Sequence, residues 1–181
     1  MIQSEYGNGG VIVTEQGVVK VLKGLNDLKR LGSISNYAIG GGIAFIVYTE
    51  PFFTDELDIF LILPLGSVSS APVTAYFINS GATRSNKKSV ITVDGTRVRF
   101  IVVLTPLEVE AVRYATKGKI LGVWTRVLTP EHLGAIAAKS NRLLDRARVA
   151  ILLSQARINQ PVLDDLLTRH GLKPRYEEIT R

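Results

Sequence analysis

The stretch from residue 37 to residue 63 constrains this chain more than any other part of its sequence. A short apolar run leads into three consecutive glycines at 40–42, and the later, almost wholly apolar run 57–63 carries Asp58, with Glu56 just before it. Residues two apart on a strand point to the same face, so these two carboxylates can hold one cation between them. Magnesium is usually bound by one or two carboxylates together with substrate phosphates, and a glycine turn lets backbone amides approach those phosphates. The stretch therefore predicts a site for a cation and a phosphate-bearing ligand.

Each of these residues also has an ordinary structural explanation. The glycines can serve only as a tight turn that needs positive φ. Asp58 can be a buried acid satisfied by backbone amides, although the cost of burying a carboxylate favours a cationic partner. Glu56 can be an outward-pointing acid at the start of a strand. The combination of the turn with both acids favours the ligand site.

Helical and strand patterns alternate along the first part of the chain. Apolar residues recur with helical spacing over 15–31, and Asp94-Gly95 between two β-rich runs indicates a hairpin. The fold class that this alternation predicts is α/β (α+β), with a small mixed β-sheet flanked by helices. The expected strands are 37–39, 57–63, the two hairpin strands and an edge strand at 122–127, and the expected helices are 15–31, 43–48, 73–77 and 107–116.

The pattern changes after Leu128. Thr129-Pro130-Glu131 marks a helix start, because proline is favoured at the first helical position. Residues 130–155 and 161–170 are predicted to be helical, with the second helix ended by Gly171 and Pro174. We therefore expect an α/β domain at 1–128 and a helical C-terminal segment at 129–181.

Composition excludes several functional classes. The chain has no cysteine and only two histidines, His132 and His170, in no ligand spacing, so a metal would bind to oxygen ligands. The glycine spacing does not fit a dinucleotide-binding turn, no Gly-Lys-Ser/Thr follows the glycines, and no nucleophile elbow is present. No apolar run is suited to a leader peptide or a membrane span, so we expect a cytoplasmic protein without a membrane partner.

The net charge of +6 raises the question of anionic partners. Basic residues concentrate around the predicted hairpin and on a later helix. Such charges commonly only solvate a surface, and the alternative is a basic rim that attracts a triphosphate or RNA. The residues concerned are Arg84, Lys87, Lys88, Arg97 and Arg99 near the hairpin, and Arg142, Arg146 and Arg148 on the helix.

The order of strand, glycine turn, helix and acid-bearing strand resembles the nucleotidyltransferase superfamily, which includes polymerase-β-like enzymes and small bacterial toxin-associated transferases. The resemblance covers most of the chain, and the segment after Thr129 is similar to abortive-infection-type and related bacterial transferases. It implies that Glu56 and Asp58 are catalytic and bind Mg²⁺ or Mn²⁺. It further implies nucleoside triphosphate contacts from Gly40, Gly41, Gly42, Thr54, Lys139 and Arg142, with Asp145 orienting Arg142; surface ion pairing is the alternative for Lys139 and Asp145.

Two departures from the family pattern bear on activity. The first acid is Glu56 rather than aspartate, a change of one methylene. The third acid of active members should lie on the strand 96–104, which offers only Arg97 and Arg99. Without a third acid, a second metal site is weakened and the acceptor hydroxyl lacks an evident base.

Two functions therefore remain for the resemblance. The first is metal-dependent transfer of a nucleoside monophosphate from a nucleoside triphosphate to a hydroxyl of a protein, an RNA end or a small molecule. The alternative is a catalytically impaired member that acts as a nucleotide-binding module or as a toxin–antitoxin component with a small cognate antitoxin. A third hypothesis is nucleic-acid binding by the basic loop at Lys87 and Lys88, with a steep salt dependence.

Overall fold

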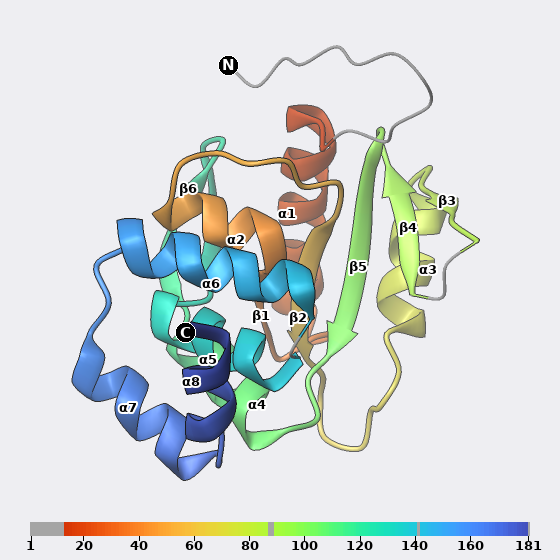
Figure 1. Cartoon of the computed structure of the whole chain (residues 1–181). Coiled ribbons are helices and arrows are strands. Elements are labelled where there is room, and N and C mark those ends of the chain that lie inside the picture. Colours follow the sequence, from red (N-terminus) through yellow and green to blue (C-terminus); the bar gives the residue numbers. More distant parts are fainter. Residues whose placement is uncertain (1–12, 87–88, 141, 181) are drawn as a thin grey trace.

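One mixed sheet organises the computed structural model of this chain, which describes residues 13–86, 89–140 and 142–180 (Figure 1). Its seven strands have the order β3-β4-β5-β2-β1-β7-β6. The strands β2 and β5 are parallel, as are β1 and β7, and the other pairs are antiparallel. The strands are β1 (Asn36–Gly40), β2 (Leu57–Ile62), β3 (Thr83–Arg84), β4 (Val90–Val93), β5 (Thr96–Val102), β6 (Thr116–Ile120) and β7 (Val123–Val127).

Helices cover both faces of this sheet. On one face α1 packs against β4, β7 and α3, while on the other α2 and α4 pack against β1 and β2. The helices α5 and α6 then pack on α2, and α7 and α8 pack on α5. Figure 1 shows α2 and α6 in front of the sheet. The helices are α1 (Glu15–Arg30), α2 (Gly41–Tyr48), α3 (Ala71–Asn79), α4 (Pro106–Tyr114), α5 (Pro130–Ser140), α6 (Leu143–Gln155), α7 (Gln160–Arg169) and α8 (Lys173–Thr180).

The first helix shows how local sequence fixes an element. Thr14 caps α1 by accepting a hydrogen bond from the Gly17 amide, and Glu15 lies in the positively polarised first turn. The buried face of α1 carries Val18, Leu22 and Leu25, which belong to the single core shared with the sheet. Burying side chains of this size stabilises the fold by roughly 1.5–3 kcal/mol each.

The centre of the sheet sets the register of the residues predicted to form the site. Gly40 of β1 lies opposite Asp58 of β2, and Asp58 lies opposite Arg99 of β5. Residues Leu57 to Leu61 of β2 are all buried, as expected for a central strand covered on both faces. Three consecutive strands of the sheet therefore meet at one short row of residues.

The α/β (α+β) fold class, with a small mixed sheet flanked by helices, is confirmed, and so are most of the expected elements. The helix expected at 107–116 ends at Tyr114, and Thr116–Ile120 forms the unexpected strand β6. As a result β7 lies inside the sheet, between β1 and β6, and the expectation of an edge strand at 122–127 was wrong. The pairing of β6 with β7 through the turn at Leu121-Gly122, both with positive φ, accounts for this.

The C-terminal helices also differ from expectation. The helix expected at 130–155 is two helices, because α5 ends at Ser140 and α6 begins at Leu143. Gly171 ends α7 as predicted, but Pro174 lies in the first turn of α8 rather than after the last helix. Proline is favoured near a helix start, so the same residue signals a beginning as readily as an end. Across the described ranges, no helix combines the length and apolar character needed to cross a membrane.

An ion pair between α4 and α7 predicts a pH dependence of stability. Arg169 donates two hydrogen bonds to Glu110, at 2.8 and 2.9 Å, and these hold the pKa of Glu110 at about 2 against the opposing effect of burial, with a smaller contribution from His170. Because this pKa lies below the unfolded value near 4.3, the pair stabilises the fold above about pH 4.5, and the contribution is lost as the pH falls toward 2. Urea unfolding measured between pH 7 and pH 2 is expected to show that the unfolding free energy of the wild type falls more steeply with pH than that of Glu110→Gln. Parallel profiles would mean that the pair adds nothing to stability.

Candidate functional site

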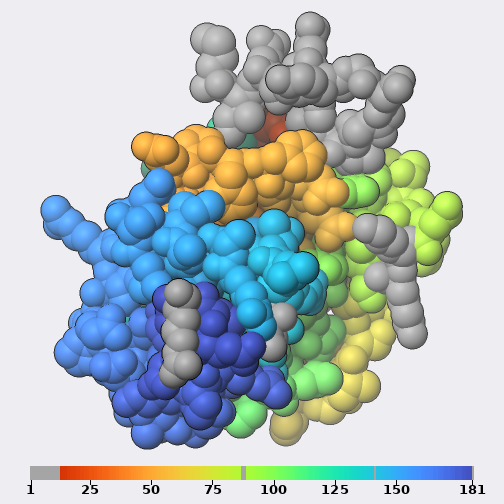
Figure 2. All heavy atoms as spheres, in the orientation of Figure 1, coloured from red at the N-terminus to blue at the C-terminus, as the bar shows by residue number. Residues whose placement is uncertain are grey.

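A small cleft lies where β2 and β5 meet the helices α2, α5 and α6. Its volume is about 100 Å³, and α2 and α6 lie side by side across this face of the molecule (Figure 2). The polar residues that line it are Asp58, Arg99, Ser140, Arg142, Asp145 and Arg148, and Gly41 is also in its wall. Ligand pockets for whole small molecules usually have several hundred Å³, so in this arrangement the cleft suits a phosphate group better than a whole nucleotide.

The glycine turn forms one wall of the cleft and leaves no room for side chains. Gly41 has φ +55°, and a Cβ there would overlap the Oδ2 atom of Asp58. A Cβ on Gly40 would overlap the ring of Phe60, and one on Gly42 would overlap the hydroxyl of Thr54. The start of α2 therefore packs closely against Asp58 and Thr54. Since helix N-terminal amides lack intrahelical acceptors, this end of α2 favours an anion.

The two predicted acids converge, but an arginine lies between them. Arg99 donates to both oxygens of Asp58, at 2.8 and 2.9 Å, and its Nε lies 3.7 Å from Glu56 Oε2. The hydrogen bond with Asp58 is the main cause that holds the pKa of Arg99 above its ordinary value. A planar guanidinium fits a carboxylate in this two-bond geometry better than a lysine would.

A neighbouring arginine extends this charged row along β5. Arg97 pairs with Asp55, and its Nη2 also lies 4.0 Å from Glu56 Oε1. The start of β2 and the residues before it therefore carry three acids, Asp55, Glu56 and Asp58, which face two arginines of β5, Arg97 and Arg99. Within this row Asp58 has the least exposed side chain, at 9%, and Arg99 retains 33% exposure.

The opposite wall of the cleft comes from α6 and the residue before it. Arg148 is 14% exposed, lies over the ring of Phe52 and approaches Asp145 at 3.5 Å. Its Nε atom is buried without a hydrogen-bond partner, and a buried unsatisfied donor of this kind costs about 1–3 kcal/mol. Arg142 is mostly exposed and lies 3.9 Å from Asp145. The cleft lining thus combines three arginines with two aspartates.

No protein-family model matches this sequence, and no curated protein matches it significantly. Solved structures do match its fold. A nucleotidyltransferase-like antigenic protein from Paracoccidioides brasiliensis shares 14% identity at a TM-score of 0.57, over 92% of this chain and 94% of that one. The antibiotic-resistance factor ANT(2'')-Ia shares 12% identity at a TM-score of 0.54, over 92% of this chain and 96% of that one in solution. A crystal structure of ANT(2'')-Ia with adenylyl-2''-tobramycin gives the same identity and TM-score, over 88% of this chain and 98% of that one.

This chain has a nucleotidyltransferase-like fold. The similarity covers nearly the whole length of both chains, so it includes the sheet and the helices that follow it. The resemblance inferred from the glycine turn and the acid-bearing strand is therefore confirmed at the level of the fold. The catalytic and ligand-binding roles of individual residues stay predictions.

In this nucleotidyltransferase-like fold, the predicted residues do not all meet. Gly41, Asp58 and Arg142 line the cleft, and Gly40, Gly42, Thr54 and Glu56 lie beside it. Lys139 instead points toward the start of α4, where it donates to Glu108 at 2.9 Å and to Thr105 at 3.0 Å. The ion-pairing alternative therefore describes Lys139, because Glu108 offers it a partly buried carboxylate. Lys87 and Lys88 lie outside the described residues.

The donor set does not fit a divalent metal as it is arranged. Among the described residues no group of three or more acids and histidines could hold an ion. Both oxygens of Asp58 are occupied by Arg99, which also faces Glu56. Binding of Mg²⁺ or Mn²⁺ would require Arg99 to leave Asp58, so the metal stays a prediction.

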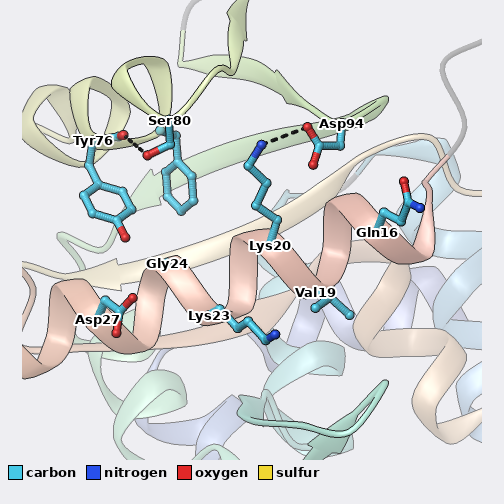
Figure 3. Close-up of a pocket in the computed structure, with 10 residues that line it drawn as sticks. Gln16, Val19, Lys20, Lys23, Gly24, Asp27, Tyr76, Ser80 and Asp94 are labelled. Carbon is cyan, nitrogen blue, oxygen red and sulfur yellow. Dashed lines mark hydrogen bonds and ion pairs between the residues drawn. The ribbon is translucent and has the colours of Figure 1, made fainter.

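A larger cleft lies elsewhere, between α1 and α3 (Figure 3), with a volume of about 490 Å³. Both acids that line it have basic partners: Lys20 reaches Asp94 at 2.9 Å, and Asp27 pairs with Arg30 of α1. Asp94 at the hairpin tip is therefore a structural partner of α1 and does not line the cleft at Asp58. This cleft is larger than the one at Asp58 but lacks its concentration of arginines.

Arg99 and Arg148 are the cleft residues whose roles the sequence pattern did not identify. The sequence indicated Arg99 as a basic residue near the hairpin and as a replacement for the missing acid, but its position opposite Asp58 comes from the parallel pairing of β2 with β5. Arg148 reaches the cleft because α6 crosses over α2. Only the basic run on the predicted helix around Arg142, Arg146 and Arg148 pointed to it.

Proposed function

We propose that this protein binds the phosphates of a nucleoside triphosphate in the cleft between β2, β5, α2 and α6, without transferring the nucleotide. The observation that carries this proposal is the two-bond contact of Arg99 with Asp58 beside Gly41, which places a permanent cation where a divalent ion would otherwise be held. Arg142 and Arg148 add positive charge at the same cleft.

The physical argument concerns charge and geometry. Arginine binds phosphate with paired hydrogen bonds, and the amides at the start of α2 favour an anion. The buried Nε of Arg148 lacks an acceptor, and a phosphate oxygen is a suitable one. Nucleotidyl transfer, in contrast, depends on cations that neutralise developing charge and on a base for the acceptor. The strand β5 supplies arginines at the positions where a third acid is expected.

Titration calorimetry with ATP and with inorganic tripolyphosphate tests the binding step. Arg148→Met is expected to weaken binding of both ligands by at least about tenfold, because it removes a charged donor worth roughly 1.5–3 kcal/mol. Arg30→Met, an exposed arginine on α1 with 76% exposure, is the matched control and is expected to bind like the wild type. Equal binding by wild type and Arg148→Met, or no binding by either, would contradict the proposed site.

Metal-dependent transfer of a nucleoside monophosphate is the second candidate. It is favoured by the convergence of Glu56 and Asp58, whose carboxylates both lie within 4 Å of the Nε of Arg99. The solved complex of ANT(2'')-Ia with adenylyl-2''-tobramycin makes a small-molecule hydroxyl the first acceptor to test, before a protein or an RNA end. Pyrophosphate release from ATP in magnesium that disappears in Asp58→Asn would establish this candidate over nucleotide binding alone.

A toxin–antitoxin component is a further form of this proposal. A small cognate antitoxin would be recognised by copurification of a second chain expressed from a neighbouring reading frame. This role is compatible with either candidate.

A further inference from the structure

The hairpin of β6 and β7 places like charges directly opposite each other. In its register Lys117 faces Arg126, and Lys119 faces Trp124. Residues two apart on a strand share a face, so these four side chains lie on one face of the hairpin. Like charges directly opposite on an antiparallel pair destabilise it. The opposed cations Lys117 and Arg126 therefore lower the stability of the hairpin rather than raise it.

The helix α1 adds a further cation, Lys29, to this face. Asn26 of α1 donates to the carbonyl of Trp124 at 2.9 Å, and Tyr37 donates to Asn26 at 2.8 Å, which together dock α1 on the hairpin. Lys29, one turn further along α1, then lies beside Lys117 and Arg126 around a cavity of about 230 Å³. We call Lys29, Lys117, Trp124 and Arg126 the hairpin patch.

Among the described residues, the positive charges of the hairpin patch have no acidic partner. Within the described part of the chain, no carboxylate lies within 4.0 Å of Lys29, Lys117 or Arg126, whereas Lys20 and Arg30 on the same helix α1 have one. Lys29 donates to the amide oxygen of Asn36, and Arg126 to the carbonyl of Arg113, both neutral acceptors. Burial lowers the pKa of Lys29, and the nearby Arg126 and Lys117 lower it further. An anion bound there would relieve this repulsion.

An aromatic ring lies exposed within the same patch. Trp124 is 63% exposed, although large apolar side chains are normally buried where they can be. Lys119 lies over its ring, with Nζ 4.9 Å from the centroid. Cations that follow a phosphate backbone, next to an aromatic ring on which a base can stack, are the usual elements of single-strand recognition.

We infer that the hairpin patch binds single-stranded nucleic acid, with phosphates at Lys29, Lys117 and Arg126 and a base stacked on Trp124. This site is independent of the proposed nucleotide cleft. Tyr37 of β1 lines the cavity beside the patch, whereas Gly40, three residues later and on the opposite face, lies against Phe60 in the cleft wall. Figure 1 accordingly shows α2 and α6 in front of the sheet, and α1 covers the other face. Binding at the patch can therefore succeed or fail regardless of binding at Asp58.

The single tryptophan of the chain makes the test direct, because all of its tryptophan fluorescence comes from Trp124. Titration with a 12-nucleotide oligo(dT), a length of about one binding site, is expected to quench this fluorescence at low salt. With three phosphates neutralised, the slope of log K against log salt is expected to be about −2, which means about a 20-fold loss of affinity between 50 and 200 mM salt. Trp124→Ala is expected to bind oligo(dT) about tenfold more weakly, as measured by the fluorescence anisotropy of a labelled oligo(dT).

Charge variants separate binding from folding. Lys117→Ala and Arg126→Ala are each expected to reduce the magnitude of the salt slope by about 0.7. Lys117→Glu should pair with Arg126, raising the midpoint of urea unfolding while abolishing binding. The exposed Lys173 on α8 supplies the control Lys173→Ala, which should leave both quenching and the salt slope unchanged.

Three outcomes would overturn the inference. The first is unchanged fluorescence with oligo(dT) at 50 mM salt. The second is quenching by poly-L-glutamate at the same affinity as by oligo(dT), which would indicate an acidic protein partner. The third is oligo(dT) binding that Lys117→Glu does not weaken, which would place the nucleic acid elsewhere.

Discussion

Arg99→Asp is expected to convert this protein from one that ignores manganese into one that binds it. The substitution removes the cation that occupies Asp58 and adds a third carboxylate opposite Asp58 and near Glu56. Without metal, three neighbouring carboxylates repel, so the melting temperature should fall below that of the wild type. With Mn²⁺ at about 100 times its Kd, binding should return about 2.7 kcal/mol of stability, or roughly 5–10 °C for a chain of this length.

Thermal unfolding in EDTA and in Mn²⁺ measures this change. Arg99→Asn is the matched control, since it also breaks the ion pair but supplies no third carboxylate. The wild type and Arg99→Asn are expected to show little shift with Mn²⁺. A manganese shift of equal size in the wild type and in Arg99→Asp would show that Arg99 does not keep the ion out. The proposal of metal-free phosphate binding would then lose its main support.

Local chemistry explains why much of the fold could be predicted. Helix α1 has a polar cap, an acid in its first turn and apolar residues at helical spacing, and the hairpin has Asp94-Gly95, both with positive φ, at its tip. The glycine turn and the acid-bearing strand β2 were predictable because each carries its own constraint. At Gly41 that constraint is positive φ, and in β2 it is burial on both faces.

Long-range pairing explains most of what could not be predicted. The strand β6 has the sequence TKGKI, with little β-rich character, and it forms because β7 pairs with it and α1 supports β7. Lys139 and Arg142 lie three residues apart, yet Lys139 points toward Glu108 and Arg142 lines the cleft. The chain bends between α5 and α6, which the continuous helical pattern from 130 to 155 did not indicate.

The site illustrates the same division. The two acids could be identified from their spacing, and their convergence follows from the geometry of one strand. The residue that lies between these two acids is determined by the register of β5 against β2. That register brings together Arg99 and Asp58, which are 41 positions apart in the sequence. The sequence showed that arginine replaces an acid on β5, but only the pairing of strands places Arg99 rather than Arg97 on Asp58.

Gly41→Ala is expected both to destabilise the fold and to weaken ligand binding. The new Cβ would overlap Asp58 Oδ2, and alanine at φ +55° is strained. Left-handed backbone costs about 1–2 kcal/mol for a residue with a side chain, and overpacking costs a further 1–3 kcal/mol, so a loss of roughly 3 kcal/mol in unfolding free energy is expected. The displaced Asp58 should also release Arg99 and weaken tripolyphosphate binding, measured by calorimetry below the unfolding transition.

Gly134→Ala is the control that separates the site from the general cost of replacing glycine. Gly134 lies within α5, and a Cβ there would meet its nearest neighbours, Tyr176 and Leu163, at 3.6 and 3.8 Å, which is ordinary contact distance. Because alanine is the better helix former, Gly134→Ala is expected to be neutral or to stabilise the fold by up to about 1 kcal/mol, with unchanged tripolyphosphate binding. If Gly41→Ala were as stable as Gly134→Ala and bound tripolyphosphate equally well, the close approach of the glycine turn to Asp58 would have no role in either folding or ligand binding.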